Sequence, residues 1–261
     1  MADTYCGKTC GQCIKKQNGE CVGCVTEKEG AKSETCEVAK CCKDGHHSSC
    51  FKCGTRLNCV TYHKAKTPNA GFISSWVAKL FIMSILVVIA SLFTAEIVTK
   101  NAPMVGKVGA AICVTFEIIY ALILIVLAKV NYGYKLAGVF ALITQAVSTV
   151  AVVVGENTLP GVIIGIVAAI ISLAAAYNEI EAHASILYDV EDRLAEKWRT
   201  LWTIYICVNL AMILGIVLLF ILPGIGAMLV LGAYVGSIIA IILKAVYLNK
   251  TSKVFRGISE R

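Results

Sequence analysis

The sequence predicts an all-α polytopic membrane protein, with six transmembrane helices and a small N-terminal, Cys-rich, metal-stabilised domain. Hydrophobic residues make up 57% of the 261-residue chain and charged residues only 16%, whereas soluble proteins carry about 25% charged residues. Eleven of the 13 cysteines lie between Cys6 and Cys59, and only Cys113 and Cys207 follow. The chain therefore divides into a cysteine-rich head and a long apolar body.

The composition changes sharply along the chain and sets the expected domain boundaries. We predict a cytoplasmic metal-binding head over residues 1–67, a linker over 68–74, a six-helix membrane domain over 75–248 and a basic cytoplasmic tail over 249–261. A helix needs about 20 apolar residues to cross the hydrocarbon core. Six stretches meet this length, at residues 75–98, 106–128, 135–154, 160–177, 200–222 and 225–247.

Proline marks the three connections that are expected on the outer side. Pro103, Pro160 and Pro223 stand there, and Gly follows the last two. The pattern suggests three helical hairpins and a possible internal repeat. The alternative is that Pro-Gly simply suits tight turns between spans. Glycines four residues apart, at 161 and 165 and at 232 and 236, permit close helix packing within the bundle or in a homo-oligomer.

Lysine and arginine are unevenly distributed among the connections. They flank the first and last spans and the second and fourth connections, while the third and fifth connections have none; only Lys100 and Lys107 oppose the trend. Because positive residues favour the cytoplasmic side, both termini are expected in the cytoplasm of a cell-membrane protein. Residues 179–199 carry an apolar stripe at helical spacing, which predicts a cytoplasmic amphipathic helix that could continue span four.

The head contains three CxxC pairs, Cys10/Cys13, Cys21/Cys24 and Cys50/Cys53. Two such pairs supply the four thiolates of a tetrahedral zinc site, and a head this small needs a cross-link in place of an apolar core. Disulfides are disfavoured by the cytoplasmic location. An iron–sulfur cluster is the sharper alternative, although the ferredoxin run of cysteines ending in proline is missing.

The opening cysteines, Tyr5-Cys-Gly-Lys-Thr-Cys-Gly-Gln-Cys13 with Cys21-Val-Gly-Cys24, resemble a Cys-rich domain of unknown function common in anaerobic bacteria and archaea. The block from Cys36 to Cys59 is similar to the second half of that family, so the resemblance covers residues 4–60. It implies a zinc-binding module and no activity. The spacer over residues 25–35 is short compared with many members.

We assign two zinc ions to the head. The ligands of the first are Cys10, Cys13, Cys21 and Cys24. The ligands of the second are Cys36, Cys41, Cys50 and Cys53. The alternates are Cys6, Cys42, Cys59, His46 and His47. Two zinc ions held by eight thiolates would bring the charge of the head close to zero. Nucleic-acid binding, which depends on positive charge, is therefore not expected.

Three polar residues interrupt the apolar spans near their centres: Glu117, Gln145 and Asn209. An ionisable group at that depth usually faces the bundle interior and serves a function. We expect the three to converge, so that Glu117 carries a proton or binds a cation. The alternative is a protonated Glu117 that only hydrogen-bonds a neighbouring helix.

These observations leave three functional hypotheses, none of them enzymatic. The first is a membrane protein whose zinc head contacts a protein partner or senses metal or redox state. The second is a small-solute or ion transporter that uses Glu117. The third is a membrane electron carrier, if the head holds an iron–sulfur cluster. Hydrolase, zincin and nucleotide-binding motifs are missing from the sequence.

Overall fold

The structure is a computed structural model that describes residues 37–46, 53, 59, 67, 69–94, 100–155 and 158–260. All regular structure in these residues is α-helical. The chain divides into two compact units, residues 1–71 with 256–261 and residues 72–255. In the described part of the head there is one helix that precedes the long ones, α2 (Glu37–Asp44).

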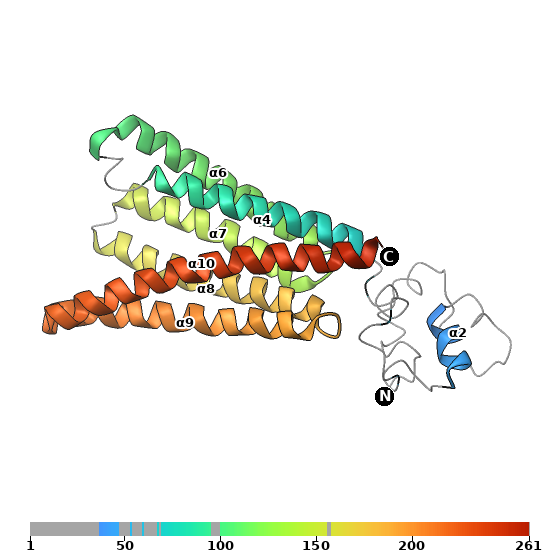
Figure 1. The fold of residues 1–261 in the computed structure, drawn as a ribbon. Helices are drawn as coiled ribbons and strands as arrows, with labels where there is room; N and C mark the ends of the chain where they lie inside the picture. The colour runs from blue at the N-terminus through green and yellow to red at the C-terminus, as the bar shows by residue number, and fades with distance from the viewer. Residues whose placement is uncertain are drawn as a thin grey trace. The chain divides into compact units, whose positions relative to one another are not determined.

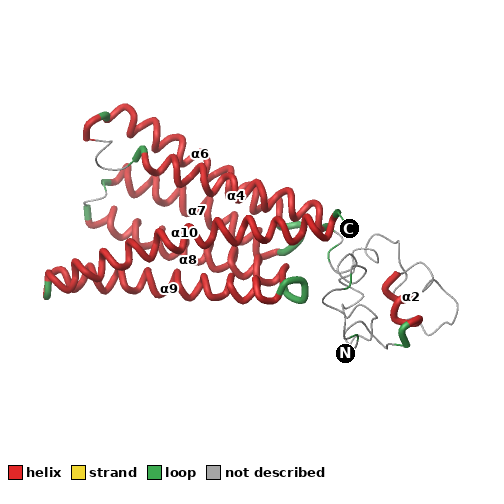
Figure 2. Tube along the Cα trace, viewed as in Figure 1, coloured by secondary structure: helices red, strands yellow, loops and turns green. Residues whose placement is uncertain are grey.

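Six long helices follow in the part of the chain that the structure describes, and each is long and apolar enough to cross a membrane (Figure 1). They are α4 (Ala70–Leu92), α6 (Pro103–Leu127), α7 (Tyr132–Val154), α8 (Leu159–Leu187), α9 (Asp192–Ile221) and α10 (Pro223–Ser259). Helix accounts for nearly all of the described body in Figure 2. By length and composition the chain is thus a multi-pass membrane protein with the six spans that the sequence predicts.

Three helices extend well beyond their predicted spans. Helix α8 continues to Leu187, α9 begins at Asp192 and α10 ends at Ser259. The length of an apolar stretch shows how much of a helix fits in the hydrocarbon core. The helix itself continues through polar residues, because its backbone hydrogen bonds form whether the side chains are polar or apolar. The predicted spans are therefore shorter than the helices.

Residues 179–199 are not one amphipathic helix, as the sequence pattern suggested, but the two facing ends of α8 and α9. Asp189 takes the left-handed conformation at φ 59°, which aspartate tolerates better than most residues. Its backbone N–H donates to Asp192 Oδ1 at 2.7 Å. The predicted apolar stripe is real: its five members, Ile180, Leu187, Val190, Leu194 and Trp198, are all buried.

The three prolines of the predicted outer turns each stand at a helix start. Pro103 is the first residue of α6, Pro160 is the second residue of α8, and Pro223 begins α10. Proline suits this position because the first N–H groups of a helix have no partner within the helix. Thr158 supplies one replacement, since its Oγ1 accepts from the Gly161 N–H at 3.2 Å.

The helices pack differently on the two sides of the level of Glu117 and Glu179. Toward the turns at residues 128–131 and 188–191, large side chains interlock, and we name this side the large-residue half. It holds all of the largest fully buried side chains, which are Trp198, Tyr134, Phe255, Leu80, Leu124, Leu127, Leu187, Leu201, Leu248, His183 and Val77.

On the opposite side, toward residues 155–158 and the α9–α10 turn, every buried residue that the structure describes is glycine or alanine; we name this side the small-residue half. The buried positions are Ala90, Gly106, Gly109, Ala151, Gly161, Ala168, Ala175, Gly215, Gly226, Ala233 and Ala240. Large apolar side chains there point outward, as at Val153 and Met228, which are 81% and 77% exposed. Such helices meet backbone to backbone, a packing common in lipid.

The two predicted glycine pairs contribute unequally to this packing. A Cβ on Gly236 would lie 2.7 Å from Val208 Cγ2, and one on Gly161 would lie 2.1 Å from the Gly155 carbonyl oxygen. Around Gly165 and Gly232 nothing lies within 4 Å of that position. One member of each pair is therefore required by close packing, and the other faces open space.

Candidate functional site

Glu117 lies on α6 in the middle of the bundle and is held by neutral donors. Its Oε2 accepts a hydrogen bond from Gln145 Nε2 on α7. Cys113, one turn earlier on α6, places its Sγ 3.9 Å from Glu117 Oε1. Among the described residues, the carboxylate thus has hydrogen-bond partners but no positively charged one.

A second carboxylate, Glu179 on α8, faces the same space and is ion-paired. Lys244 Nζ on α10 lies 2.8 Å from Glu179 Oε2, and only 6% of the Glu179 side chain is exposed. Tyr120 Oη on α6 donates to the other oxygen, Oε1. The Lys244 ammonium also lies over the Tyr120 ring, 5.0 Å from its centroid. One ammonium is therefore held by both a carboxylate and an aromatic face.

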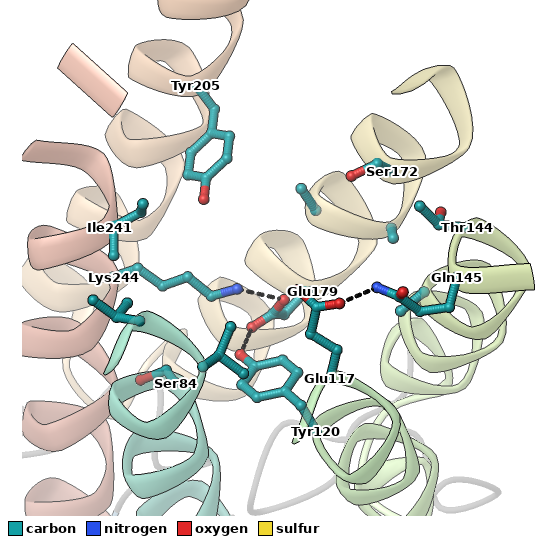
Figure 3. A pocket seen from close by; sticks show the side chains of 15 residues that line it. Ser84, Glu117, Tyr120, Thr144, Gln145, Ser172, Glu179, Tyr205, Ile241 and Lys244 are labelled. Carbon is teal, nitrogen blue, oxygen red and sulfur yellow. Dashed lines mark hydrogen bonds and ion pairs between the residues drawn. The ribbon is translucent and has the colours of Figure 1, made fainter. Parts of the chain in front are cut away.

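These groups line a cavity of about 310 Å³ to which all six long helices contribute. In Figure 3 the carboxyl groups of Glu117 and Glu179 point toward each other, with Lys244 and Gln145 on opposite sides of the pair. Hydroxyls of Ser84, Thr144 and Ser172 add neutral polar groups to the wall. Aliphatic side chains and the Tyr205 ring complete it. A mostly apolar pocket with a few convergent polar groups is typical of a small-molecule site.

Charge in the cavity is not balanced. The charges of Glu179 and Lys244 cancel, since the two groups form an ion pair at 2.8 Å. In the part of the chain that the structure describes, Glu117 is then the one carboxyl group of the cavity whose charge is not balanced. A bare carboxylate at this depth is costly. Glu117 therefore needs a proton or a bound cation to complete the site.

Below the cavity, in the large-residue half, His183 lies in a fully buried aromatic group. Its Nδ1 is 2.8 Å from Tyr134 Oη, and its ring stacks on Trp198 with centroids 4.4 Å apart. Trp198 Nε1 donates to Thr251 Oγ1 at 3.1 Å. His183 Nε2 has no hydrogen-bond partner among the described residues. This group ties α7, α8, α9 and α10 together beneath the cavity.

Of the three mid-membrane residues that the sequence singled out, the structure brings Glu117 and Gln145 together and leaves Asn209 apart. Asn209 Nδ2 donates to the Tyr205 carbonyl oxygen of its own helix at 2.8 Å, and Asn209 does not line the cavity. An amide that bonds back to its own helix needs no partner across the bundle.

Two central residues, Lys244 and Glu179, are not among those that the sequence pattern predicts. Lys244 interrupts the sixth apolar stretch, which is the same signal that identified Glu117. Glu179 was assigned to the polar segment after span four. Sixty-five positions separate the two, so only the helix arrangement brings them together.

The head is described at few of its predicted metal ligands. Cys41, Cys42, Cys53, Cys59 and His46 are described, while the positions outside the described residues are Cys6, Cys10, Cys13, Cys21, Cys24, Cys36, Cys50 and His47. Among the residues that are described, no three His, Cys, Asp or Glu side chains are arranged to hold a metal ion.

Cys41 is an exposed residue of α2. Its pKa is raised above the ordinary value, first by desolvation and then by the charges that Cys59, Cys42 and Cys53 would carry, with a smaller effect of Asp44.

No family model, curated protein or solved structure matches this chain, and the resemblance over residues 4–60 is not supported by a match. The interpretation of the site therefore depends on its own chemistry.

Proposed function

We propose that this protein is a membrane carrier for small solutes, which bind in the mid-bundle cavity beside Glu117. One observation carries the proposal: a carboxyl group without a positive partner faces a cavity of about 310 Å³ at the centre of six apolar helices. Ionisable residues inside membrane spans commonly mark substrate or ion pathways. A purely structural bundle has no need for an unmatched acid beside empty volume.

The asymmetric packing supports a carrier in particular. Interlocked side chains in the large-residue half include the fully buried His183 and Trp198 and block passage from the cavity on that side. Helices in the small-residue half meet mainly through glycine and alanine. Small contact surfaces of this kind permit sliding and rocking at lower cost than interlocked ones, which is the movement that opens one side of a carrier.

The test is solute uptake by proteoliposomes that contain the full chain. We use choline, sodium, sorbitol and sulfate, which cross a bare bilayer slowly and differ in charge. Uptake of at least one of them above empty vesicles is expected, and Glu117→Gln should lower it at least about tenfold. Glu181→Gln is the matched control, because Glu181 lies on the same helix as Glu179 but is 44% exposed and pairs with Arg199 at 3.4 Å.

Equal uptake by the Glu117→Gln protein and the unchanged protein would contradict the carrier proposal. So would the lack of uptake of every solute by a protein that stays folded in the vesicle. The orientation of the chain, with both termini in the cytoplasm, stays a prediction from the charge bias. Protease protection of tags at the two ends tests it. A protease added outside intact cells should leave both tags uncut and should cleave them only after the membrane is permeabilised.

We also propose that the head binds zinc and contacts a protein partner or senses metal or redox state. The support is the sequence of the head, in which three CxxC pairs have the spacing that suits tetrahedral zinc. Metal content and the absorption spectrum of the full chain, purified without oxygen, test it. Two zinc ions per chain and no visible band are expected. Iron with sulfide and a broad visible band would replace this proposal by the electron-carrier hypothesis.

A further inference from the structure

We propose that Glu117 exchanges one proton for one monovalent organic cation, so that the two occupy the cavity in turn. This inference rests on the carrier function and names its substrate class. It starts from the groups that face Glu117. The titratable and charged side chains around the cavity, from every helix that lines it, are Cys113, Tyr120, Glu179, Tyr205 and Lys244.

Only one of these groups, Lys244, carries a positive charge, and it is already engaged. Its ammonium lies 2.8 Å from Glu179 Oε2, while the donors on Glu117 are an amide and a thiol. With both carboxyl groups ionised and one ammonium present, the site has one negative charge that is not balanced. A proton or a monovalent cation on Glu117 brings the site to neutrality, and neutrality avoids the cost of an isolated charge in lipid.

Lys244 also shows how this cavity holds an organic ammonium. Its head group lies between the carboxylate of Glu179 and the face of Tyr120, 5.0 Å from the ring centroid. Glu117 is three residues from Tyr120 on α6, and residues at that spacing share a helix face. Tyr205 supplies a second ring in the wall. A substrate cation beside Glu117 thus meets the same combination of carboxylate and aromatic groups.

The walls favour an organic cation over a metal ion. Most of the lining is hydrocarbon, including Val87, Val88, Ile241 and three alanines, which would contact a carbon skeleton. A divalent metal ion needs several acidic or imidazole ligands around it, and no group of three is arranged for this in the described chain. The volume of about 310 Å³ equals about ten water molecules at about 30 Å³ each. That is more space than a bare alkali ion fills.

The exchange step balances in atoms and charge. The protonated carboxyl of Glu117 loses its proton to the bulk solution as the cation enters, and the cation pairs with the carboxylate that forms. The reverse step returns the proton and releases the cation. The cavity has the same net charge in both states. The two states are the one with Glu117 protonated and the one with Glu117 paired with the cation. If the carrier changes conformation only in these two states, it exchanges one proton for each cation.

Choline is the probe for the test, because its quaternary nitrogen has no proton to release. The full chain in detergent is titrated with choline in weak buffer, while calorimetry measures binding and an indicator measures released protons. Below the pKa of Glu117 we expect one proton released per choline bound, and a Kd that rises about tenfold for each unit by which the pH is lowered. At a pH above the pKa of Glu117, where no proton has to leave, the neutral carbon isostere 3,3-dimethylbutan-1-ol should bind at least about tenfold more weakly than choline.

Variants connect the proton to Glu117. Glu117→Gln should release no proton on titration and should raise the Kd of choline at least about tenfold. Glu117→Asp keeps a carboxyl group and should still release a proton when choline binds. This variant tests the role of the carboxyl group even if the glutamine variant does not fold. Glu181→Gln should behave as the unchanged protein. Release of one proton by the Glu117→Gln protein would overturn the proposal.

Two results would separate this inference from the carrier proposal. Choline binding without proton release at any pH between about 5 and about 9 overturns the exchange even if vesicles transport a solute. Stronger binding of the neutral isostere than of choline at a pH above the pKa of Glu117 does the same. Proton release on choline binding without uptake in vesicles supports the exchange site and overturns the carrier function instead.

Discussion

The two halves of the bundle are built from the same kind of apolar sequence but pack by different means. In the large-residue half the fully buried side chains include Trp198, Tyr134 and Phe255. In the small-residue half the buried positions in the described chain are glycine and alanine only. Within lipid, burying a large apolar side chain gains little because the lipid is equally apolar. Near water the same burial gains the full hydrophobic effect.

The positions of the halves agree with this difference. Polar ends of α8, α9 and α10 extend the large-residue half beyond the predicted spans. Trp202, an aromatic residue of the kind that favours the membrane interface, lies on α9 in this half. We infer that the interlocked residues reach the interface and the water beyond it, while the small-residue half lies in the hydrocarbon.

The largest expected effect comes from removing an interlocked side chain. Trp198→Ala should lower the free energy of unfolding by about 3–5 kcal/mol, because the residue is fully buried and the change leaves a cavity. Reversible unfolding in detergent measures it. Met228→Ala in the small-residue half is the control and should have almost no effect, since Met228 is 77% exposed. Similar losses for both variants would contradict the comparison.

The ion pair at the boundary between the halves is the next test. Lys244→Met leaves the buried Glu179 carboxylate unpaired and should lower the free energy of unfolding by about 3 kcal/mol. Adding Glu179→Gln to Lys244→Met should restore much of that loss. Arg199→Met breaks the exposed pair with Glu181 and should cost less than about 1 kcal/mol. Equal losses from both lysine and arginine variants would show that burial does not distinguish the pairs.

Overpacking tests the small-residue half directly. A Cβ on Gly226 would lie 2.4 Å from the Leu219 backbone N on the neighbouring helix, so Gly226→Val should cost about 1–3 kcal/mol. Gly232→Ala has nothing within 4 Å of its new atom and should be neutral. Thermal unfolding of the two variants in the same detergent compares them. A neutral Gly226→Val would mean that α9 and α10 separate readily there.

A polar contact in the large-residue half gives the smallest expected change. Ser74 Oγ donates to the Ser252 carbonyl oxygen at 3.0 Å, and Ser252 Oγ donates back to the Ser74 carbonyl oxygen at 2.9 Å. Ser74→Ala should lower the free energy of unfolding by about 0.6 kcal/mol, as interhelical hydrogen bonds in membrane proteins do on average. Ser91→Ala is the control, because Ser91 donates within its own helix. A loss above about 2 kcal/mol would mean that the pair is coupled to neighbouring contacts.

The sequence predicts the six spans because apolar length is a local property. It does not predict where the helices end, since α10 continues through polar residues to Ser259. It also predicts Glu117 and Gln145 as mid-membrane residues. It does not show that Glu179 meets Lys244, because their meeting depends on how each helix is rotated. Side chains that face lipid and side chains that face the interior are both apolar. The sequence pattern therefore does not predict which side of each helix faces the interior.

The stack of Trp198 on His183 also gives the protein an internal optical reporter. Trp198 is one of three tryptophans in the chain, and its indole is fully buried, with a centroid distance of 4.4 Å to the imidazole. An indole shielded from water emits at shorter wavelength than an exposed one. Changes in the blue edge of the emission spectrum would therefore follow the large-residue half in the working protein, without any added dye.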